Sequence, residues 1–203
     1  MYMNNKFNPV IHHRHSIRLP EYDYSSPGYY FVTICAKDRE CIFGEIRNGI
    51  MGLSELGTII HNEWLNSQLI RKNIRLDQFV VMPNHIHGIV EIIDHKGIDH
   101  VAGIDNGIDR NQSLQRQNPN IHQYGPQSNN LFTIIRGFKG ATTKQINQYI
   151  GNIEGGSIWQ SRFYDRIINT VEELENVKEY IRNNPIHWND DRNNPANTHL
   201  RRD

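Results

Sequence analysis

The chain has 203 residues, and its 22 basic and 22 acidic side chains give a formal net charge of zero when histidine is neutral. A neutral chain is poorly suited to coating duplex DNA by bulk electrostatic attraction, although it can still bind a short strand locally. The length allows one domain with a hydrophobic core, and no apolar run approaches the roughly 20 residues that span a bilayer.

The amino-terminal region shows no sign of a targeting segment, because it lacks the apolar stretch of a signal peptide. The two cysteines, Cys35 and Cys41, do not have the spacing of a metal-binding pair. We therefore expect reduced thiols and a cytoplasmic location. Residues 1–22 are predicted to form a flexible basic arm, in which Arg14 and Arg18 are candidates for contact with DNA. A plain flexible terminus is the alternative.

Residues 29–53 are predicted to contain strands. Residues 29–35 are aromatic and β-branched, which is typical of a strand, and a second strand is expected at residues 41–46. Asn48-Gly49 predicts a hairpin turn, since both central positions of a type I′ turn need a positive φ. Ser54 is expected to cap a helix that extends to about Gln68, because apolar residues recur there at three- and four-residue steps.

A second strand pair is predicted around two histidines. Residues 74–82 are expected to form a strand, and Pro83-Asn84 to break or bulge the chain before His85 and His87. Because side chains alternate along a strand, the two imidazoles project from the same side. Two neutral imidazoles on a rigid strand can bind one divalent ion. The alternative is that they are ordinary polar residues at a sheet edge.

The middle of the chain changes character at about residues 95–130, where glycine-rich repeats and a Gln/Asn-rich run have little apolar content. We predict a disordered or extended insertion there. A helix is expected at residues 131–150, with Arg136 and Lys139 on a basic flank that contacts phosphates or simply faces solvent. An extended segment at residues 158–168 follows. Trp159, Phe163 and Tyr164 are its candidates for base stacking, and Arg162 and Arg166 are its candidates for phosphate contact. Its aromatic residues can equally belong to the core.

The last predicted helix begins at Thr170, which forms a capping box with Glu173, and ends at Asn184 before Pro185. Tyr180 and Asn184 lie four residues apart, so they share one face of this helix. A tyrosine on a helix stripe is usually a packed core residue, and its position alone does not indicate a nucleophile. Residues 189–203 are predicted to be a polar, frayed tail.

Three separated motifs together carry a resemblance to a known family. They are residues 82–87 (Met-Pro-Asn-His-Ile-His), residues 159–165 (Trp-Gln-Ser-Arg-Phe-Tyr-Asp) and residues 179–185 (Glu-Tyr-Ile-Arg-Asn-Asn-Pro). In this order they resemble the REP-associated tyrosine transposases, which belong to the single-tyrosine branch of the HUH endonucleases and are related to the IS200-like transposases. The resemblance spans roughly residues 29–187, interrupted by the insertion.

The resemblance implies an α+β fold, an antiparallel sheet of ferredoxin-like or RNA-recognition type with helices packed on it, in a domain at residues 23–188. It implies that His85, His87 and Asn184 bind Mg²⁺ or Mn²⁺, although imidazole ligands by themselves would equally suit zinc. It also implies that Tyr180 attacks single-stranded, hairpin-containing DNA to give a covalent 5′-phosphotyrosine. Relatives act as monomers or as homodimers, and the sequence leaves that choice open.

Two other functions remain possible from the residues. A domesticated, non-cleaving nucleic-acid-binding protein would have no use for the whole set of His85, His87, Tyr180 and Asn184. A metal-dependent phosphodiester hydrolase would need further carboxylates or histidines to activate water, and near the histidine pair the sequence offers only Glu91.

Overall fold

The computed structural model describes residues 22–93, 130–151 and 156–197, so the predicted arm and most of the predicted insertion lie outside the described residues. At its centre is an antiparallel four-stranded sheet in the order β4-β5-β1-β6. The strands are β1 (Gly28–Cys35), β4 (Ile74–Met82), β5 (His85–Ile92) and β6 (Tyr164–Ile168). β2 (Gly44–Arg47) and β3 (Ile50–Leu53) form a separate hairpin.

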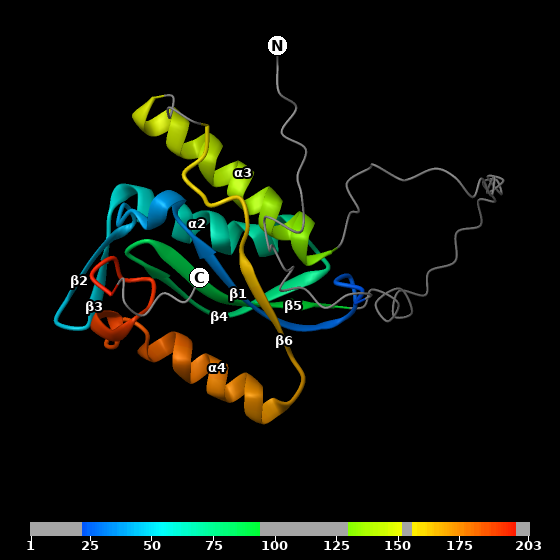
Figure 1. Ribbon diagram of the computed structural model, residues 1–203. Helices are drawn as coiled ribbons and strands as arrows, with labels where there is room; N and C mark the ends of the chain where they lie inside the picture. Colours follow the sequence, from blue (N-terminus) through cyan, green and yellow to red (C-terminus); the bar gives the residue numbers. More distant parts are fainter. Residues whose placement is uncertain (1–21, 94–129, 152–155, 198–203) are drawn as a thin grey trace, which may run out of the picture.

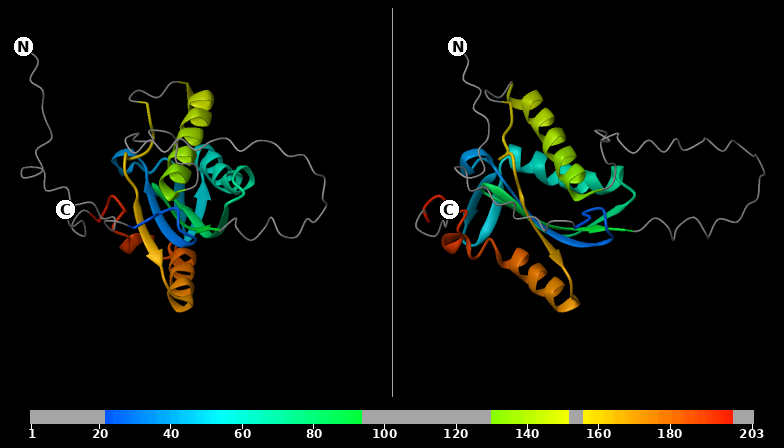
Figure 2. Two further views of the ribbon diagram at one scale, coloured as in Figure 1. Left: turned by 90° about the vertical axis from the view of Figure 1, so that its right-hand side faces the viewer. Right: turned by 45° about the vertical axis from the view of Figure 1, so that its right-hand side comes forward.

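Helices cover both faces of this sheet. α2 (Glu55–Ile70) and α3 (Leu131–Ile150) lie together on one face, and α4 (Val171–Asn183) lies on the other (Figure 1). Two short 3-10 helices, η1 (Lys37–Arg39) and η3 (Trp188–Asp190), complete the described elements. The turned views show the same three layers (Figure 2). The predicted α+β class with an antiparallel sheet is confirmed.

The alternation of side chains along β5 gives the two faces different contents. Ile86 and Val90 are fully buried in the main core with α2 and α3. Gly88 also faces this side, where a Cβ would lie 2.5 Å from the Trp64 ring, so only glycine lets the strand and helix approach so closely. His85, His87 and Ile89 project to the other face, toward α4. The sheet thus separates the main core from a polar site.

The turns agree with the sequence in two cases. Asn48 and Gly49 have φ values of 53° and 75°, as a type I′ hairpin turn requires. Pro83 and Asn84 break the chain as predicted, because they form the tight turn between β4 and β5. Met82 pairs regularly with His85 across this turn, so the break is not a bulge. The irregularity in this strand pair lies between Leu76 and Phe79 instead.

The helix caps follow the predicted chemistry. The side chains of Ser54, Asn130 and Thr170 each accept a hydrogen bond from the backbone amide three residues later. Glu173 accepts from the amide of Asn169, one residue before the one expected for a capping box. α3 is continuous through its two glycines, and only the last five residues of the predicted extended segment form a strand. None of the described helices is long and apolar enough to cross a membrane.

The described residues after α4 make specific contacts up to residue 197, which differs from the frayed tail predicted at residues 189–203; residues 198–203 lie outside the described residues. Residues 188–197, here called the closing segment, return to the end of the sheet. The Asn84 amide donates to the carbonyl of Asn193 at 2.9 Å, and Arg39 donates to the carbonyl of Arg192 at 3.2 Å. Asn193 is only 4% exposed. Polar side chains bonded to backbone hold this segment, and such contacts leave no hydrophobic period in the sequence.

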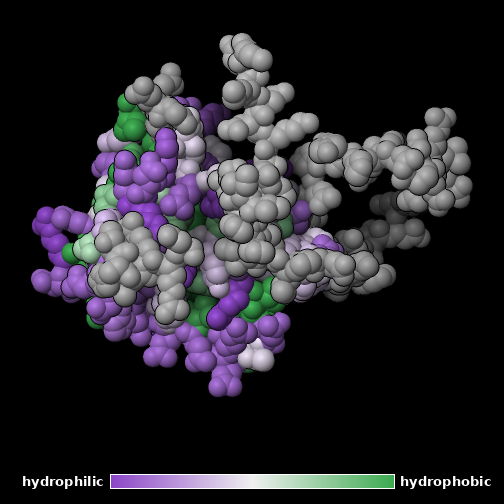
Figure 3. Space-filling model, in the orientation of Figure 1, coloured by the Kyte–Doolittle hydropathy of each residue, from purple (hydrophilic) through white to green (hydrophobic). Residues whose placement is uncertain are grey.

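The surface in Figure 3, which has the orientation of Figure 1, is largely hydrophilic where it is coloured. One hydrophobic spot lies at the carboxyl end of α3, where Tyr149 and Ile150 are exposed. Hydrophobic side chains also show between the sheet and α4, at the side where β6 lies.

Candidate active site

His85 and His87 lie side by side beneath α4, as the alternation along β5 predicts. Both are almost completely buried, at 0% and 2% exposure. Their Nε2 atoms are 3.0 Å apart. Burial lowers the pKa of His85 far below its usual range, and burial lowers the pKa of His87 to about 3. Both imidazoles are therefore neutral at physiological pH.

Hydrogen bonds on the outer side of each ring determine which nitrogen carries the proton. The Asn84 Nδ2 donates to the carbonyls of Arg39 and Asn193. Its Oδ1 therefore faces His85 Nδ1 at 2.8 Å and accepts a hydrogen bond from the Nδ1–H group. Thr33 Oγ1 lies 2.9 Å from His87 Nδ1 and can accept in the same way. Each Nε2 then presents a lone pair to the space between the rings. Partners of this kind commonly orient metal-binding histidines.

α4 places Tyr180 over this pair. Leu174, Val177 and Ile181 bury one stripe of the helix against the sheet, and this leaves Tyr180 half exposed at its margin. The Tyr180 hydroxyl lies 3.2 Å from His87 Nε2. Burial and the Asp191 carboxylate raise the pKa of Tyr180, whereas a hydrogen bond with Asn184 and the charge of Arg192 act in the opposite direction. The phenol is therefore protonated at neutral pH in this state.

Two further oxygen atoms in the site have no hydrogen-bond partner among the described residues. They are Oδ1 of Asn184, one turn after Tyr180, and Oδ2 of Asp191 in the closing segment. Asp191 Oδ2 lies 3.6 Å from His85 Nε2, and burial raises the pKa of this carboxyl group. Asp191 was not among the residues predicted from the sequence. The available signal was the run of turn-forming Asn and Asp residues at 189–194, which indicates that the chain turns back after Pro185.

These donor atoms fit a divalent cation. Ligand atoms of His85, His87 and Asp191 lie within 4.8 Å of one another. Asn184, whose side-chain oxygen has no partner among the described residues, lines one cavity with His87 and Asp191. The 3.0 Å between the two Nε2 atoms is close to the separation of nitrogen ligands that bind one ion at about 2.1 Å and about a right angle. Buried acceptors without donors are costly, and a cation would remove that cost.

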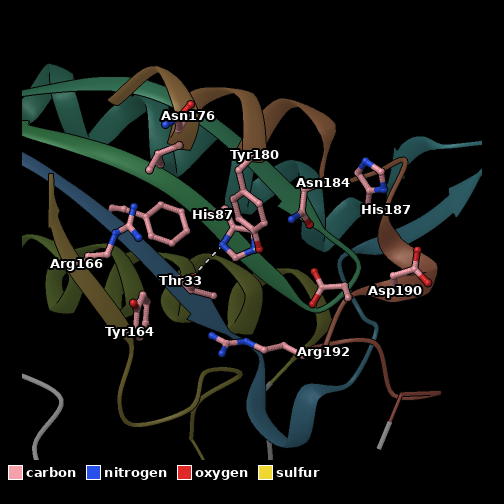
Figure 4. A pocket seen from close by; sticks show the side chains of 13 residues that line it. Thr33, His87, Tyr164, Arg166, Asn176, Tyr180, Asn184, His187, Asp190 and Arg192 are labelled. Atoms are coloured by element: carbon pink, nitrogen blue, oxygen red, sulfur yellow. Dashed lines mark hydrogen bonds between the residues drawn. The ribbon is translucent and has the colours of Figure 1, made fainter. Parts of the chain in front are cut away.

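A cavity of about 650 Å³ extends from this cluster across the sheet (Figure 4). Its floor consists of two cross-strand rows, His87–Thr33–Tyr164 and Phe31–Arg166. Its roof includes Asn176, Tyr180 and Asn184, which follow one another at four-residue steps along α4. The closing segment forms the end wall with Asp190, Asp191 and Arg192. Pockets that hold small molecules have about 300–1,000 Å³, so this one exceeds the needs of an ion alone.

Of the described residues predicted to contact DNA, the structure brings Tyr164 and Arg166 into this cavity. Trp159 is 4% exposed and donates its indole proton to Thr142, so it is a core residue and is not available for base stacking. Lys139 donates to the carbonyls of Gln160 and Arg162, and burial lowers its pKa to about 8.

The other predicted DNA contacts within the described residues lie away from the cavity. Arg136, like Lys139, belongs to α3 on the opposite face of the sheet. Arg162 is exposed, and Phe163 is half-buried with Lys139 over its ring at 5.6 Å. Arg14 and Arg18 lie outside the described residues.

Sequence comparisons relate this chain to known proteins. Residues 121–184, which include Tyr180 and Asn184, match the family model described as "Transposase IS200 like". An uncharacterized protein of Haemophilus influenzae is 40% identical over 189 residues, which cover 93% of this chain and 97% of that protein.

Two solved structures are also similar. A REP-associated tyrosine transposase bound to a REP hairpin has a TM-score of 0.53 and 14% identity, covering 85% of this chain and 74% of that one. At this identity the likeness concerns the fold. A putative transposase from Deinococcus radiodurans has a TM-score of 0.38 and 13% identity, covering 82% of this chain and 95% of that one.

Proposed function

Because the chain belongs to the family of IS200-like transposases, we propose that it cleaves and rejoins single-stranded DNA with Tyr180 as the nucleophile. Members of a transposase family cut and transfer DNA strands, so the chain is an enzyme of this class. The observation that carries the finer proposal is the position of the Tyr180 hydroxyl, 3.2 Å from His87 Nε2 at the edge of a cluster of unpartnered ligand atoms.

The proposed reaction is an in-line substitution at phosphorus. The Tyr180 oxygen forms a bond to the scissile phosphorus while the bond from phosphorus to the 3′ oxygen of the preceding nucleotide breaks. The phenol loses its proton, and the departing 3′ oxygen gains one. The products are a 5′-phosphotyrosine and a free 3′-hydroxyl, and a second 3′-hydroxyl can reverse the step to rejoin DNA. No oxidant, nucleotide cofactor or water nucleophile is needed.

His85, His87, Asp191 and Asn184 are the residues that would hold a divalent metal, with Mg²⁺ or Mn²⁺ expected for this family. When bound, such an ion would act as a Lewis acid toward a phosphate oxygen and favour the Tyr180 phenolate. The protein's part is to keep Nε2 of both imidazoles free of protons through Asn84 and Thr33 and to hold the phenol close to them. The rigid strand and the buried stripe of α4 provide this positioning.

The proposed substrate is a single strand that carries a hairpin. The solved relative with the same fold is bound to a REP hairpin. Here the cavity floor offers the Tyr164 ring and the Arg166 guanidinium two strands away from the histidines, or about 10 Å across the sheet. Aromatic and arginine side chains on a sheet surface suit an unpaired nucleotide beside the scissile phosphate.

A second candidate function gains support from Asp191. A metal-dependent phosphodiester hydrolase needs a carboxylate beside its ion to activate water, and the sequence analysis found none that was well placed. The structure brings Asp191 to this position. The two functions differ in their product, because a hydrolase leaves no covalent protein–DNA adduct and incorporates oxygen from water into the phosphate.

The decisive experiment uses labelled single-stranded hairpin DNA, Mn²⁺ and the full chain. We expect a denaturation-resistant adduct with the wild-type protein and with Tyr164→Phe, a matched variant that removes another tyrosine hydroxyl from the same cavity. Tyr180→Phe should form no adduct while it still binds the strand. An adduct in Tyr180→Phe would remove Tyr180 from this role, and cleavage without any adduct would favour the hydrolase.

A further inference from the structure

Arg192 lines the cavity and forms no ion pair with a carboxylate among the described residues. The other arginine of the lining, Arg166, forms a 3.1 Å ion pair with Glu173. The Arg192 guanidinium forms no ion pair with a carboxylate and donates no hydrogen bond among the described residues. It extends from the closing segment past Thr33 to Tyr164, whose ring centroid is 5.9 Å away (Figure 4). A guanidinium with all its donors unused is ready to bind an anion.

The position of Arg192 is fixed by the same side chain that orients His85. Asn84 accepts from His85 Nδ1 through its oxygen and donates to the carbonyl of Asn193 through its nitrogen. Arg39 holds the carbonyl of Arg192 itself at 3.2 Å. The histidine and the backbone of the closing segment are therefore tied to one buried amide. Arg192 consequently starts from a defined place relative to the histidines.

The charge of Arg192 acts on the whole site. After burial, it is the next cause that lowers the pKa of His87, and it also contributes to the lowered pKa of His85. It opposes the burial that raises the pKa values of Tyr180 and Asp191. The positive charge beside this cluster favours an anion next to the Arg192 guanidinium. A phosphodiester is the anion that the proposed function brings there.

We propose that Arg192 binds a non-bridging oxygen of the scissile phosphate, so that the closing segment is part of the active site. This inference rests on the proposed function. The planar guanidinium can donate two parallel hydrogen bonds to a phosphate, whereas an ammonium group acts as a point charge. The negative charge on the phosphate oxygens during attack by Tyr180 would lie against a cation that is already in place.

The test compares Arg192→Ala and Arg192→Lys with the wild-type protein and with Arg182→Ala, a charge-matched variant of an exposed arginine on α4 that does not line the cavity. Single-turnover cleavage is measured at saturating DNA on two strands. One has an ordinary scissile phosphate, and the other has an uncharged methylphosphonate at that position. We expect Arg192→Ala to cleave the ordinary strand about 10²–10³-fold more slowly, with partial recovery in Arg192→Lys and no change in Arg182→Ala.

On the methylphosphonate strand the effect of Arg192→Ala should fall below about tenfold, because the charge that it binds has been removed. An equal loss on both strands would mean that Arg192 only fastens the closing segment to Tyr164, and this would overturn the proposal. Faster cleavage by Arg192→Ala would show that Arg192 obstructs the cavity, and an unchanged rate would show no role. Both outcomes would also overturn it.

The failure of this inference can be told apart from the failure of the proposed function. A wild-type protein that forms the Tyr180 adduct, with an Arg192→Ala variant that forms it as fast, refutes the inference alone. If the wild-type protein forms no adduct, the proposed function fails, and Arg192 is tested by titration with inorganic phosphate while the imidazole NMR signals of His85 and His87 are followed. Saturable shifts that Arg192→Ala abolishes would support an anion site, and identical shifts in both proteins would refute it.

Discussion

Replacing Asn84 with alanine should weaken metal binding and stability together, because this residue links three parts of the site. Asn84 is fully buried, and its three hydrogen bonds, at 2.8–2.9 Å, join His85, Arg39 and Asn193. Each bond contributes about 1 kcal/mol, and buried groups left without partners add to the loss. We expect Asn84→Ala to lower the free energy of unfolding by about 3–5 kcal/mol, a large part of the roughly 5–15 kcal/mol of a typical domain.

The same variant should bind Mn²⁺ about 10–100-fold more weakly, the usual cost of removing a partner that orients a histidine ligand. Urea unfolding gives the stability, and titration calorimetry with Mn²⁺ gives the affinity. Ser54→Ala is the control, because it removes a helix cap for about 1 kcal/mol on the opposite face of the sheet and should leave the Mn²⁺ affinity unchanged. A folded Asn84→Ala protein with wild-type affinity for Mn²⁺ would refute the role of Asn84.

Three other predictions concern the proposed nucleophile Tyr180, the two histidines and the strand that carries them. Tyr180→Phe should change the urea midpoint little, because the hydroxyl that it removes belongs to a half-exposed side chain. Its affinity for the DNA strand, measured by fluorescence anisotropy, should stay within a few-fold of wild type. A large loss of affinity would give Tyr180 a role in binding. In EDTA, the free energy of unfolding should fall by up to about 1.4 kcal/mol per pH unit for each histidine as the pH drops below 6.5. Below pH 6.5 the two histidines bind protons in the unfolded chain but stay neutral in the folded protein. The double variant His85→Gln/His87→Gln should therefore show a flatter dependence of the urea midpoint on pH from pH 7 to 5. Equal slopes in both proteins would contradict the assigned pKa directions. Gly88→Ala places a methyl group 2.5 Å from the Trp64 ring and should cost about 1–3 kcal/mol in urea unfolding; an unchanged midpoint would show that Trp64 moves aside freely.

Periodicity in the sequence was enough to predict the parts of the site that belong to regular elements. The two-residue period of β5 placed both histidines on one face, and the four-residue step on α4 placed Tyr180 and Asn184 together. Hydrophobic burial fixes both elements, and burial leaves a periodic pattern. The structure agrees because the apolar neighbours of these polar residues must be buried. Their burial determines which side of β5 and which side of α4 carries the polar residues.

The parts held by polar contacts could not be predicted in this way. Asp191 and Arg192 reach the cavity because Asn84 and Arg39 bind backbone carbonyls of the closing segment, and such bonds can involve almost any sequence. Trp159 shows the reverse difficulty, because composition does not distinguish a ring that stacks on a base from one that packs under α3. Its hydrogen bond to Thr142 decides between these only in three dimensions.

The position of Tyr180 bears on how many protein molecules are needed for one cleavage event. Its hydroxyl meets His87 of the same polypeptide, and the carboxylate and the free guanidinium of the cavity also come from that polypeptide. No exchange of helices between two copies is needed to bring these groups together. The cleavage rate per molecule should therefore stay constant when the protein is diluted. An excess of an inactive variant mixed with the wild-type protein should not lower the wild-type rate.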